Sequence, residues 1–177
     1  MKKIIIAIDS FKGCLTSAEA GKAAEKGIKS INPFCHTSVI PIADGGEGLL
    51  DVLITATKGK YITLSAHGPL MKMAKTHYGL SGNGRTAIIE MAAISGLPLV
   101  PIEQRNPMLT TTFGTGELIK DALNKGCRNF IIGIGGSATN DAGLGMLQAL
   151  GFRFLDKSGH TLGTGGQIME AVANIDT

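Results

Sequence analysis

Tryptophan is absent from the sequence, and aromatic residues make up only 5% of it. So few aromatic side chains argue against a stacking platform for single-stranded nucleic acid. The basic residues exceed the acidic ones by only three charges, and no run of five like charges occurs. We therefore expect no nucleic-acid partner and no basic patch for a membrane surface.

Long hydrophobic runs and clustered cysteines are also missing. The apolar run Ile4–Ile8 ends at Asp9. A signal peptide needs about 7–15 apolar residues and a membrane-spanning helix about 18, so we interpret this run as a buried strand and expect no membrane partner. The three cysteines, Cys14, Cys35 and Cys127, stand far apart without the spacing of a metal site. This usage is typical of the reducing cytoplasm.

Glycine, in contrast, is abundant, with 25 of 177 residues. This is about twice the usual share of ~7%, and the glycines follow no collagen-like period. Hydrophobic residues make up 44% and charged residues 18% of the chain. The composition therefore predicts a globular protein with a sizeable core, of one domain or two small ones.

The order of the expected elements favours an α/β fold. Ile4–Ile8 and Val39–Ile42 are short runs typical of parallel strands that are covered on both faces. Between them, Thr16 and Glu19 have the spacing of a capping box, which predicts the start of a helix. Pro33 is expected to end that helix.

The pattern changes after Gly59, where we expect a meander or the entry to a second domain. Tyr61–Ser65, Ala74–Leu80 and Ala87–Met91 are strand candidates separated by glycine and proline. From Thr110 the alternation of helix and strand returns. The next helix is expected to bury Leu118, Ile119, Ala122 and Leu123 on one face.

Three segments, 44–48, 110–116 and 133–141, share one design: a strand or loop rich in Gly, Ser or Thr runs into the start of an expected helix. A helix N-terminus presents unpaired N–H groups, and glycine lets the backbone approach an anion. Each loop alone is better explained by a tight turn of an α/β protein. Three of them in one short chain favour phosphate or nucleotide chemistry.

The segment around Gly133 also imitates a dinucleotide-binding fingerprint. Gly133, Gly135 and Ala138 form the pattern G-x-G-x-x-A, and Asp156 follows at about the distance of the ribose-binding acid. An NAD-dependent oxidoreductase is therefore the alternative enzyme class. A small-molecule sensor on the same fold is the non-enzymatic alternative.

Two further loops carry charged candidates. Lys12 follows the first expected strand, where open α/β sheets bind ligands, and suits an anionic group of the substrate. Asp44 and Glu47 flank a pair of glycines, and a carboxylate there suits Mg²⁺ or a base acting on a hydroxyl. The alternatives are a solvated lysine and acidic helix capping.

Five segments together resemble the bacterial type I glycerate kinases, in order along the chain. They are AIDSFKG (7–13), PIADGGEG (41–48), AIIEMA (87–92), TFGTGELI (112–119) and GIGGSATND (133–141). The resemblance implies ATP- and Mg²⁺-dependent transfer of phosphate to D-glycerate by a cytoplasmic enzyme. The sequence does not indicate which hydroxyl is phosphorylated.

The resemblance also implies a Rossmann-like parallel sheet domain with a second α/β domain inserted into it, and a site in the cleft between them. Residues 1–66 are expected to form the N-terminal part of the first domain, and 67–177 part of the inserted one. Lys12 and Asp44 are the expected catalytic residues, and Asp141 the expected metal ligand. The expected substrate- and phosphate-binding residues are Ser10, Gly45, Gly46, Thr115, Gly135, Gly136, Ser137 and Asn140.

Members of this family are longer than this chain, which matches their N-terminal half. We therefore expect a truncated fold with an open sheet edge. A second chain or self-association is expected to complete it, and this chain alone is expected to turn over little glycerate.

Overall fold

A computed structural model describes residues 3–177, and its centre is a four-stranded sheet. Strand β3 pairs with β4 and β4 with β5 in antiparallel fashion, whereas β5 and β6 run parallel. The strands are β3 (Lys60–His67), β4 (Met73–Leu80), β5 (Thr86–Glu90) and β6 (Asn129–Gly133). The three strand candidates that follow Gly59 are thereby confirmed.

Alternate residues of β5 build two separate cores. Ala87 and Ile89 face helix α4 (Phe113–Asn124), where they join a cluster that includes Leu118 and Tyr78. Ile88 faces the opposite way, toward Leu50 and Ile54 of α2 (Leu49–Thr57). This alternation follows from the two-residue period of a strand, so β5 is covered on both faces. The predicted core face of α4 is confirmed.

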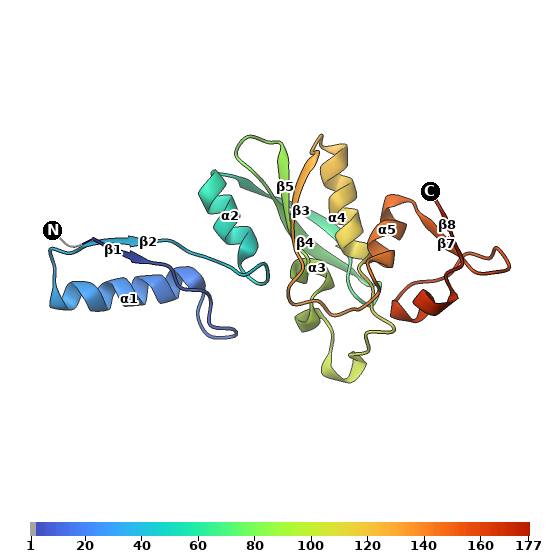
Figure 1. The fold of residues 1–177 in the computed structure, drawn as a ribbon, viewed down its shortest axis with the longest axis horizontal. Coiled ribbons are helices and arrows are strands. Elements are labelled where there is room, and N and C mark those ends of the chain that lie inside the picture. The colour runs from blue at the N-terminus through green and yellow to red at the C-terminus, as the bar shows by residue number, and fades with distance from the viewer. Residues whose placement is uncertain (1–2) are drawn as a thin grey trace.

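The N-terminal unit lies at one end of the molecule, beyond α2 (Figure 1). It consists of two parallel strands, β1 (Lys3–Ile6) and β2 (His36–Val39), joined through α1 (Ser17–Ile31). The predicted capping box is confirmed, because Thr16 and Glu19 bond reciprocally at the start of α1.

Two expectations for this unit are wrong. Val39–Ile42 is not the second strand, because β2 ends at Val39. The first strand is not buried on both faces, because Ile5 is 61% exposed. A strand is enclosed only when other strands and helices lie on all its sides, and β1 has one paired neighbour among the described residues.

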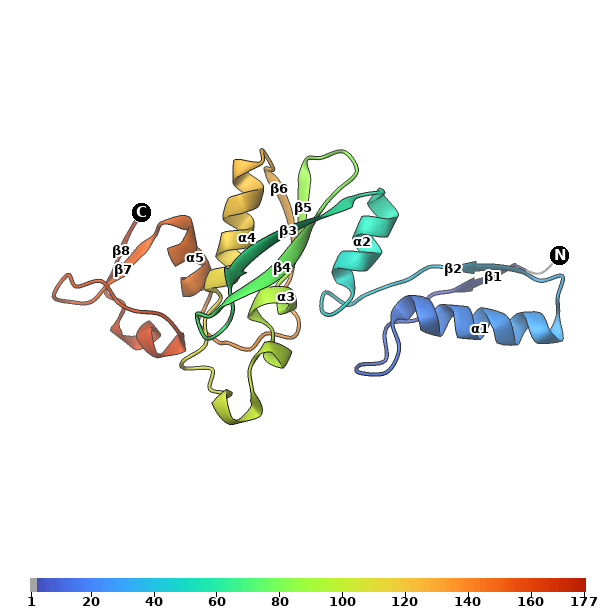
Figure 2. The same cartoon turned by 180° about the vertical axis from the view of Figure 1, so that it is seen from behind.

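The C-terminal segment lies at the other end, as Figure 2 shows from behind. Helix α5 (Leu144–Leu150) packs beside α4, and β7 (Arg153–Leu155) pairs antiparallel with β8 (Asn174–Asp176). Short helical turns complete the chain: α3 (Ala92–Ser95), η1 (Leu97–Leu99), η2 (Ile102–Gln104) and η3 (Gly166–Ala171).

The α/β class is confirmed, with β1–β2 and β5–β6 as parallel pairs. The predicted domain division at 66/67 stays a prediction; the central sheet itself begins at Lys60. Within residues 3–177, no helix has the length and apolar character that a membrane span requires.

Candidate functional site

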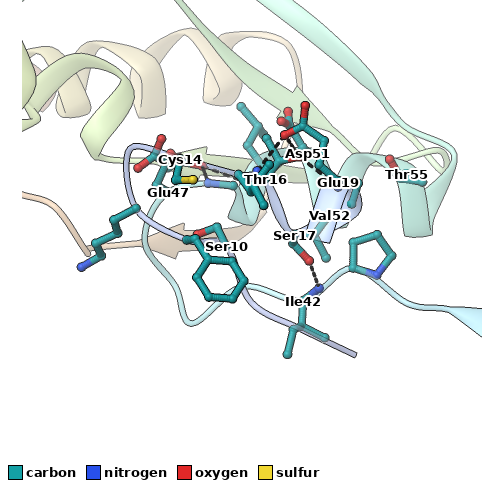
Figure 3. Close-up of a pocket in the computed structure, with 18 of the residues that line it drawn as sticks. Ser10, Cys14, Thr16, Ser17, Glu19, Ile42, Glu47, Asp51, Val52 and Thr55 are labelled. Carbon is teal, nitrogen blue, oxygen red and sulfur yellow. Dashed lines mark hydrogen bonds between the residues drawn. The ribbon is translucent and has the colours of Figure 1, made fainter. Parts of the chain in front are cut away.

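A pocket of about 580 Å³ lies between the N-terminal unit and the central sheet unit (Figure 3). One wall consists of residues 10–19 together with Pro41 and Ile42. The other consists of residues of the 47–55 segment, with His77 of β4, Glu90 of β5 and Ala93. Three of the segments that carried the family resemblance therefore contribute to the walls of this pocket.

The first wall is a tight turn held onto helix α1. Phe11 and Leu15 exchange backbone hydrogen bonds of 2.8 and 3.1 Å. The Ser17 hydroxyl donates to the carbonyl of Ile8 at 2.7 Å and accepts from the Ile42 N–H at 2.9 Å, the bond drawn in Figure 3. Ser17 thus ties the chain after β1 to the chain after β2.

The turn places two predicted residues on the pocket, Ser10 and Lys12. Lys12 is exposed, and it is the only lysine or arginine among the described residues that line the pocket. Four carboxylates line the same pocket, those of Glu19, Glu47, Asp51 and Glu90. Lys12 is therefore the one charged side chain among the described lining residues that attracts an anionic ligand. The individual roles of Ser10 and Lys12 stay predictions.

On the second wall, Glu90 lies at the N-terminus of α2. Its Oε2 accepts hydrogen bonds from the N–H groups of Gly48 and Leu50, both at 3.2 Å. Gly48 precedes the helix at φ 88° and has no side chain to cap it, so Glu90 satisfies donors that would otherwise lack a partner. Burial raises the pKa of Glu90, and the carboxylates of Asp51 and Glu47 raise it further.

The loop around Gly45 packs directly against the loop around Gly135. The Gly135 N–H donates to the Gly45 carbonyl at 3.1 Å. A Cβ on Gly135 would lie 2.6 Å from Cα of Gly46, and one on Gly133 would lie 2.5 Å from the Gly45 carbonyl oxygen. These glycines are therefore required by the close approach of two backbones. A Cβ on Gly45 would meet nothing within 4 Å, and the predicted phosphate-binding roles of Gly45, Gly46 and Gly135 stay predictions.

Asp44 does not line the pocket. Its side chain is exposed, and Oδ1 accepts from the Gly46 N–H at 3.1 Å within its own loop. The catalytic role predicted for Asp44 therefore has no geometric support from this pocket.

The remaining predicted loop residues, Gly136, Ser137 and Asn140, also lie outside the pocket lining. The Gly136 carbonyl accepts from the Leu97 N–H at 2.9 Å, and the Ser137 hydroxyl is bonded to the backbone of Thr139. The first contact joins the loop to η1, and the Ala138 N–H, which donates to the Ser95 carbonyl at 2.9 Å, joins it to α3.

The structure places Asp141 in the interior instead of at a metal site. Its carboxylate is 1% exposed and accepts from three backbone N–H groups, those of Thr112 at 2.8 Å, Gly143 at 3.1 Å and Gly145 at 3.2 Å. The hydroxyls of Thr111 and Thr112 also donate to it. With both oxygens occupied in this way, Asp141 does not fit the predicted role of Mg²⁺ ligand.

Thr115 is likewise a core residue. It is completely buried in α4, and its hydroxyl shares a 2.8 Å hydrogen bond with that of Ser95. The predicted substrate contact is corrected on this ground, because no surface of Thr115 is open to a ligand. Among the described residues, no cluster of three or more acidic, histidine or cysteine side chains is arranged to hold a metal.

The dinucleotide fingerprint is not realised. In a Rossmann unit the acidic residue follows a strand parallel to the first. Here Asp156 follows β7, which pairs with β8 and not with β6, and its Oδ1 accepts from the N–H groups of Ser158 and His160 in its own turn. The hydrogen bonds from that turn lower the pKa of Asp156.

Glu90 and His77 are lining residues that the sequence predictions did not include. A signal for Glu90 existed: it stands in the AIIEMA segment and ends an apolar strand, the position where α/β sheets present ligand-binding groups. His77 carries no such signal.

A family model described as the glycerate kinase family matches residues 4–177. The chain belongs to the glycerate kinase family. It is 54% identical to a glycerate kinase of Bacillus subtilis over 98% of this chain and 46% of that protein, and 49% identical to a glycerate 2-kinase of Escherichia coli with the same coverage. A crystal structure described as a glycerate kinase 2 of Salmonella typhimurium superposes with a TM-score of 0.84 at 48% identity, covering 99% of this chain and 47% of that one.

The chain thus spans about half the length of the relatives that it matches. The family model covers almost all of this chain. None of the comparisons supports an oxidoreductase.

Proposed function

We propose that this protein phosphorylates D-glycerate with ATP as the phosphoryl donor. The observation that carries the proposal is convergence: three of the five family segments contribute to one pocket, through Ser10 and Lys12, through Gly48, and through Glu90. The family has named members that are glycerate kinases. Its motifs here build a cavity large enough for a ligand, and this supports the same function.

Phosphoryl transfer depends mainly on positioning and on neutralising negative charge, and the pocket offers Lys12 for this beside the carboxylates of Glu19, Glu47, Asp51 and Glu90. Lys12 is proposed to bind the anionic groups, the carboxylate of glycerate or the phosphates of ATP. The apolar side chains of Phe11, Leu15, Ile42 and Val52 offer a surface for the uncharged parts of the ligands. Mg²⁺ is part of the proposal because kinases neutralise phosphate charge with it, and no residue is assigned to hold it.

Two finer statements complete the proposal. The 2-hydroxyl is the proposed acceptor, because the Escherichia coli relative is named a glycerate 2-kinase. The cytoplasm is the proposed compartment, because the cysteine usage is typical of a reducing environment.

Completion by a second chain or by self-association is proposed as well. Its support is the apolar surface around β1 and α1, where Ile5 is 61%, Ile31 89% and Phe34 87% exposed. Large apolar side chains exposed at one end of the protein are candidates for an association surface.

The deciding experiment follows ADP release from ATP and Mg²⁺ with and without D-glycerate. The product is identified by adding enolase, which consumes 2-phosphoglycerate but not the 3-isomer. Lys12→Ala should lower kcat/KM at least ~10-fold, or about 1.4 kcal/mol of transition-state stabilisation. The matched control Lys157→Ala, at an exposed lysine outside the pocket lining, should leave kcat/KM unchanged. ADP release that does not depend on glycerate would refute the proposed function.

A further inference from the structure

The two carboxylate oxygens of Glu90 have different surroundings. Oε2 is anchored by the N–H groups of Gly48 and Leu50 at the start of α2. Within residues 3–177, Oε1 of Glu90 has no hydrogen-bond donor. It is also open to solvent, because the one buried side-chain oxygen or nitrogen without a partner in that region belongs to Gln148. The backbone therefore fixes Oε2, whereas Oε1 has no donor. Because Glu90 lines the pocket, Oε1 is available to accept a hydrogen bond from a ligand.

The other carboxylates of the pocket are exposed, whereas Glu90 is partly buried. Glu19 also has one anchored oxygen, because its Oε2 accepts from the N–H and the hydroxyl of Thr16, but it lies at the surface. Asp51 is exposed and accepts from the Tyr61 hydroxyl, and Glu47 is exposed without an anchoring bond among the described residues. Glu90 alone among them is partly buried and held by two backbone donors.

We propose that Glu90 is the general base of this pocket, with Oε1 taking the proton of the glycerate hydroxyl that becomes phosphorylated. This inference rests on the proposed function. In the step, the O–H bond of the hydroxyl breaks and its proton moves to Oε1. The hydroxyl oxygen bonds to the γ-phosphorus of ATP, and the bond from that phosphorus to the β–γ bridging oxygen breaks, its electron pair leaving with ADP.

The electrostatic surroundings fit a base. Burial raises the pKa of Glu90, and Asp51 and Glu47 raise it further, while the two backbone hydrogen bonds oppose the shift. The remaining charged or titratable groups that line the pocket are Lys12, Glu19, Cys14 and His77. A base must be ionised to accept a proton, so kcat/KM is expected to fall as the pH falls through a pKa above that of ordinary glutamate.

Glu90→Gln is the decisive variant, because the amide oxygen of glutamine still accepts from Gly48 and Leu50 while the side chain cannot take up the proton. We expect kcat to fall at least ~100-fold, KM for D-glycerate to stay within about 3-fold, and the acidic limb of the pH profile to disappear. Glu90→Asp keeps a carboxylate and should recover part of kcat. Glu103→Gln, an exposed glutamate in η2, is the matched control and should behave as the unmodified protein.

The outcomes separate the two proposals. If the unmodified protein forms ADP with glycerate and Glu90→Gln keeps its kcat and its acidic limb, the role of Glu90 is overturned while the proposed function stands. If neither this chain alone nor its assembly with a second chain or a second copy forms glycerate-dependent ADP, the proposed function falls and the role of Glu90 falls with it. Thermal unfolding followed by circular dichroism tests whether each variant is folded. A folded Glu90→Gln protein that has lost kcat and the acidic limb of its pH profile supports Glu90 as the general base.

Discussion

Replacing Asp141 tests whether this carboxylate holds the structure together. It joins the start of α4 to the start of α5, because Thr112 and Gly145 donate to it from the two chain segments. In Asp141→Ala the N–H groups of Thr112, Gly143 and Gly145 lose their acceptor at a site that is 1% exposed. Each buried donor without a partner costs about 1–3 kcal/mol, so we expect a total loss of about 3–6 kcal/mol after water has satisfied part of them.

Asp141→Asn gives a smaller, geometrically defined loss. The best orientation of the amide puts its NH₂ group at the Oδ1 position, where it meets the N–H of Gly143. The oxygen at the Oδ2 position keeps the bonds from Thr112 and Gly145. One lost bond and one facing pair of donors cost about 2–3 kcal/mol, which lowers Tm by about 4–12 °C in a chain of this size.

The assay is urea unfolding followed by circular dichroism, with Asp176→Asn as the control. Asp176 pairs with Arg153 at the surface, and such pairs contribute at most about 1 kcal/mol. An Asp141→Ala protein within about 0.5 kcal/mol of the unmodified one would refute the structural role. Unchanged stability combined with a weaker dependence on Mg²⁺ would restore the metal role instead.

Three other predictions follow from the same contacts. Gly135→Ala should destabilise the protein by about 1–3 kcal/mol in urea unfolding, because its Cβ would lie 2.6 Å from Cα of Gly46, whereas Gly163→Ala meets nothing within 4 Å and should be near neutral. Glu90→Gln should raise Tm at pH 8. Because the pKa of Glu90 is raised in the folded protein, folding favours the protonated carboxyl, and the stability that this carboxyl contributes is present at acidic pH and lost as the pH rises through the folded pKa. The difference in Tm between Glu90→Gln and the unmodified protein should therefore vanish toward pH 4. Phe34→Lys should lower the mass measured by sedimentation if the exposed apolar surface self-associates; an unmodified protein that is already monomeric at all concentrations would contradict this.

Local sequence patterns were sufficient for the elements whose signals lie within a few residues. The capping box of Thr16 and Glu19, the apolar face of α4 and the strands after Gly59 are all encoded at short spacing. The family could also be inferred from the sequence, because five short segments in a fixed order carry it.

The burial of the first strand could not be inferred in this way. Ile4–Ile8 has the composition of an enclosed strand, yet Ile5 is exposed, because enclosure depends on which other strands and helices surround β1. For Thr115 and Asp141 the predictions were wrong in the opposite way, because residues expected at a ligand site are buried. Polar residues at a helix start resemble ligand-binding groups, and only the tertiary structure shows that Thr115 pairs with Ser95 of α3 and that Asp141 accepts from the Thr112 N–H at the start of α4.

The sequence by itself determined the family, the α/β class and the presence of Ser10 and Lys12 on a loop after the first strand. Tertiary structure alone decided that Gly45 and Gly135 form a contact between two backbones. It also decided that Glu90 lies at the start of α2, a helix that begins about forty residues before Glu90 in the chain. The physical reason is the same in each case. Hydrogen bonds and close contacts between distant segments depend on how strands and helices are placed in space, and that placement leaves no periodic trace in the residues it brings together.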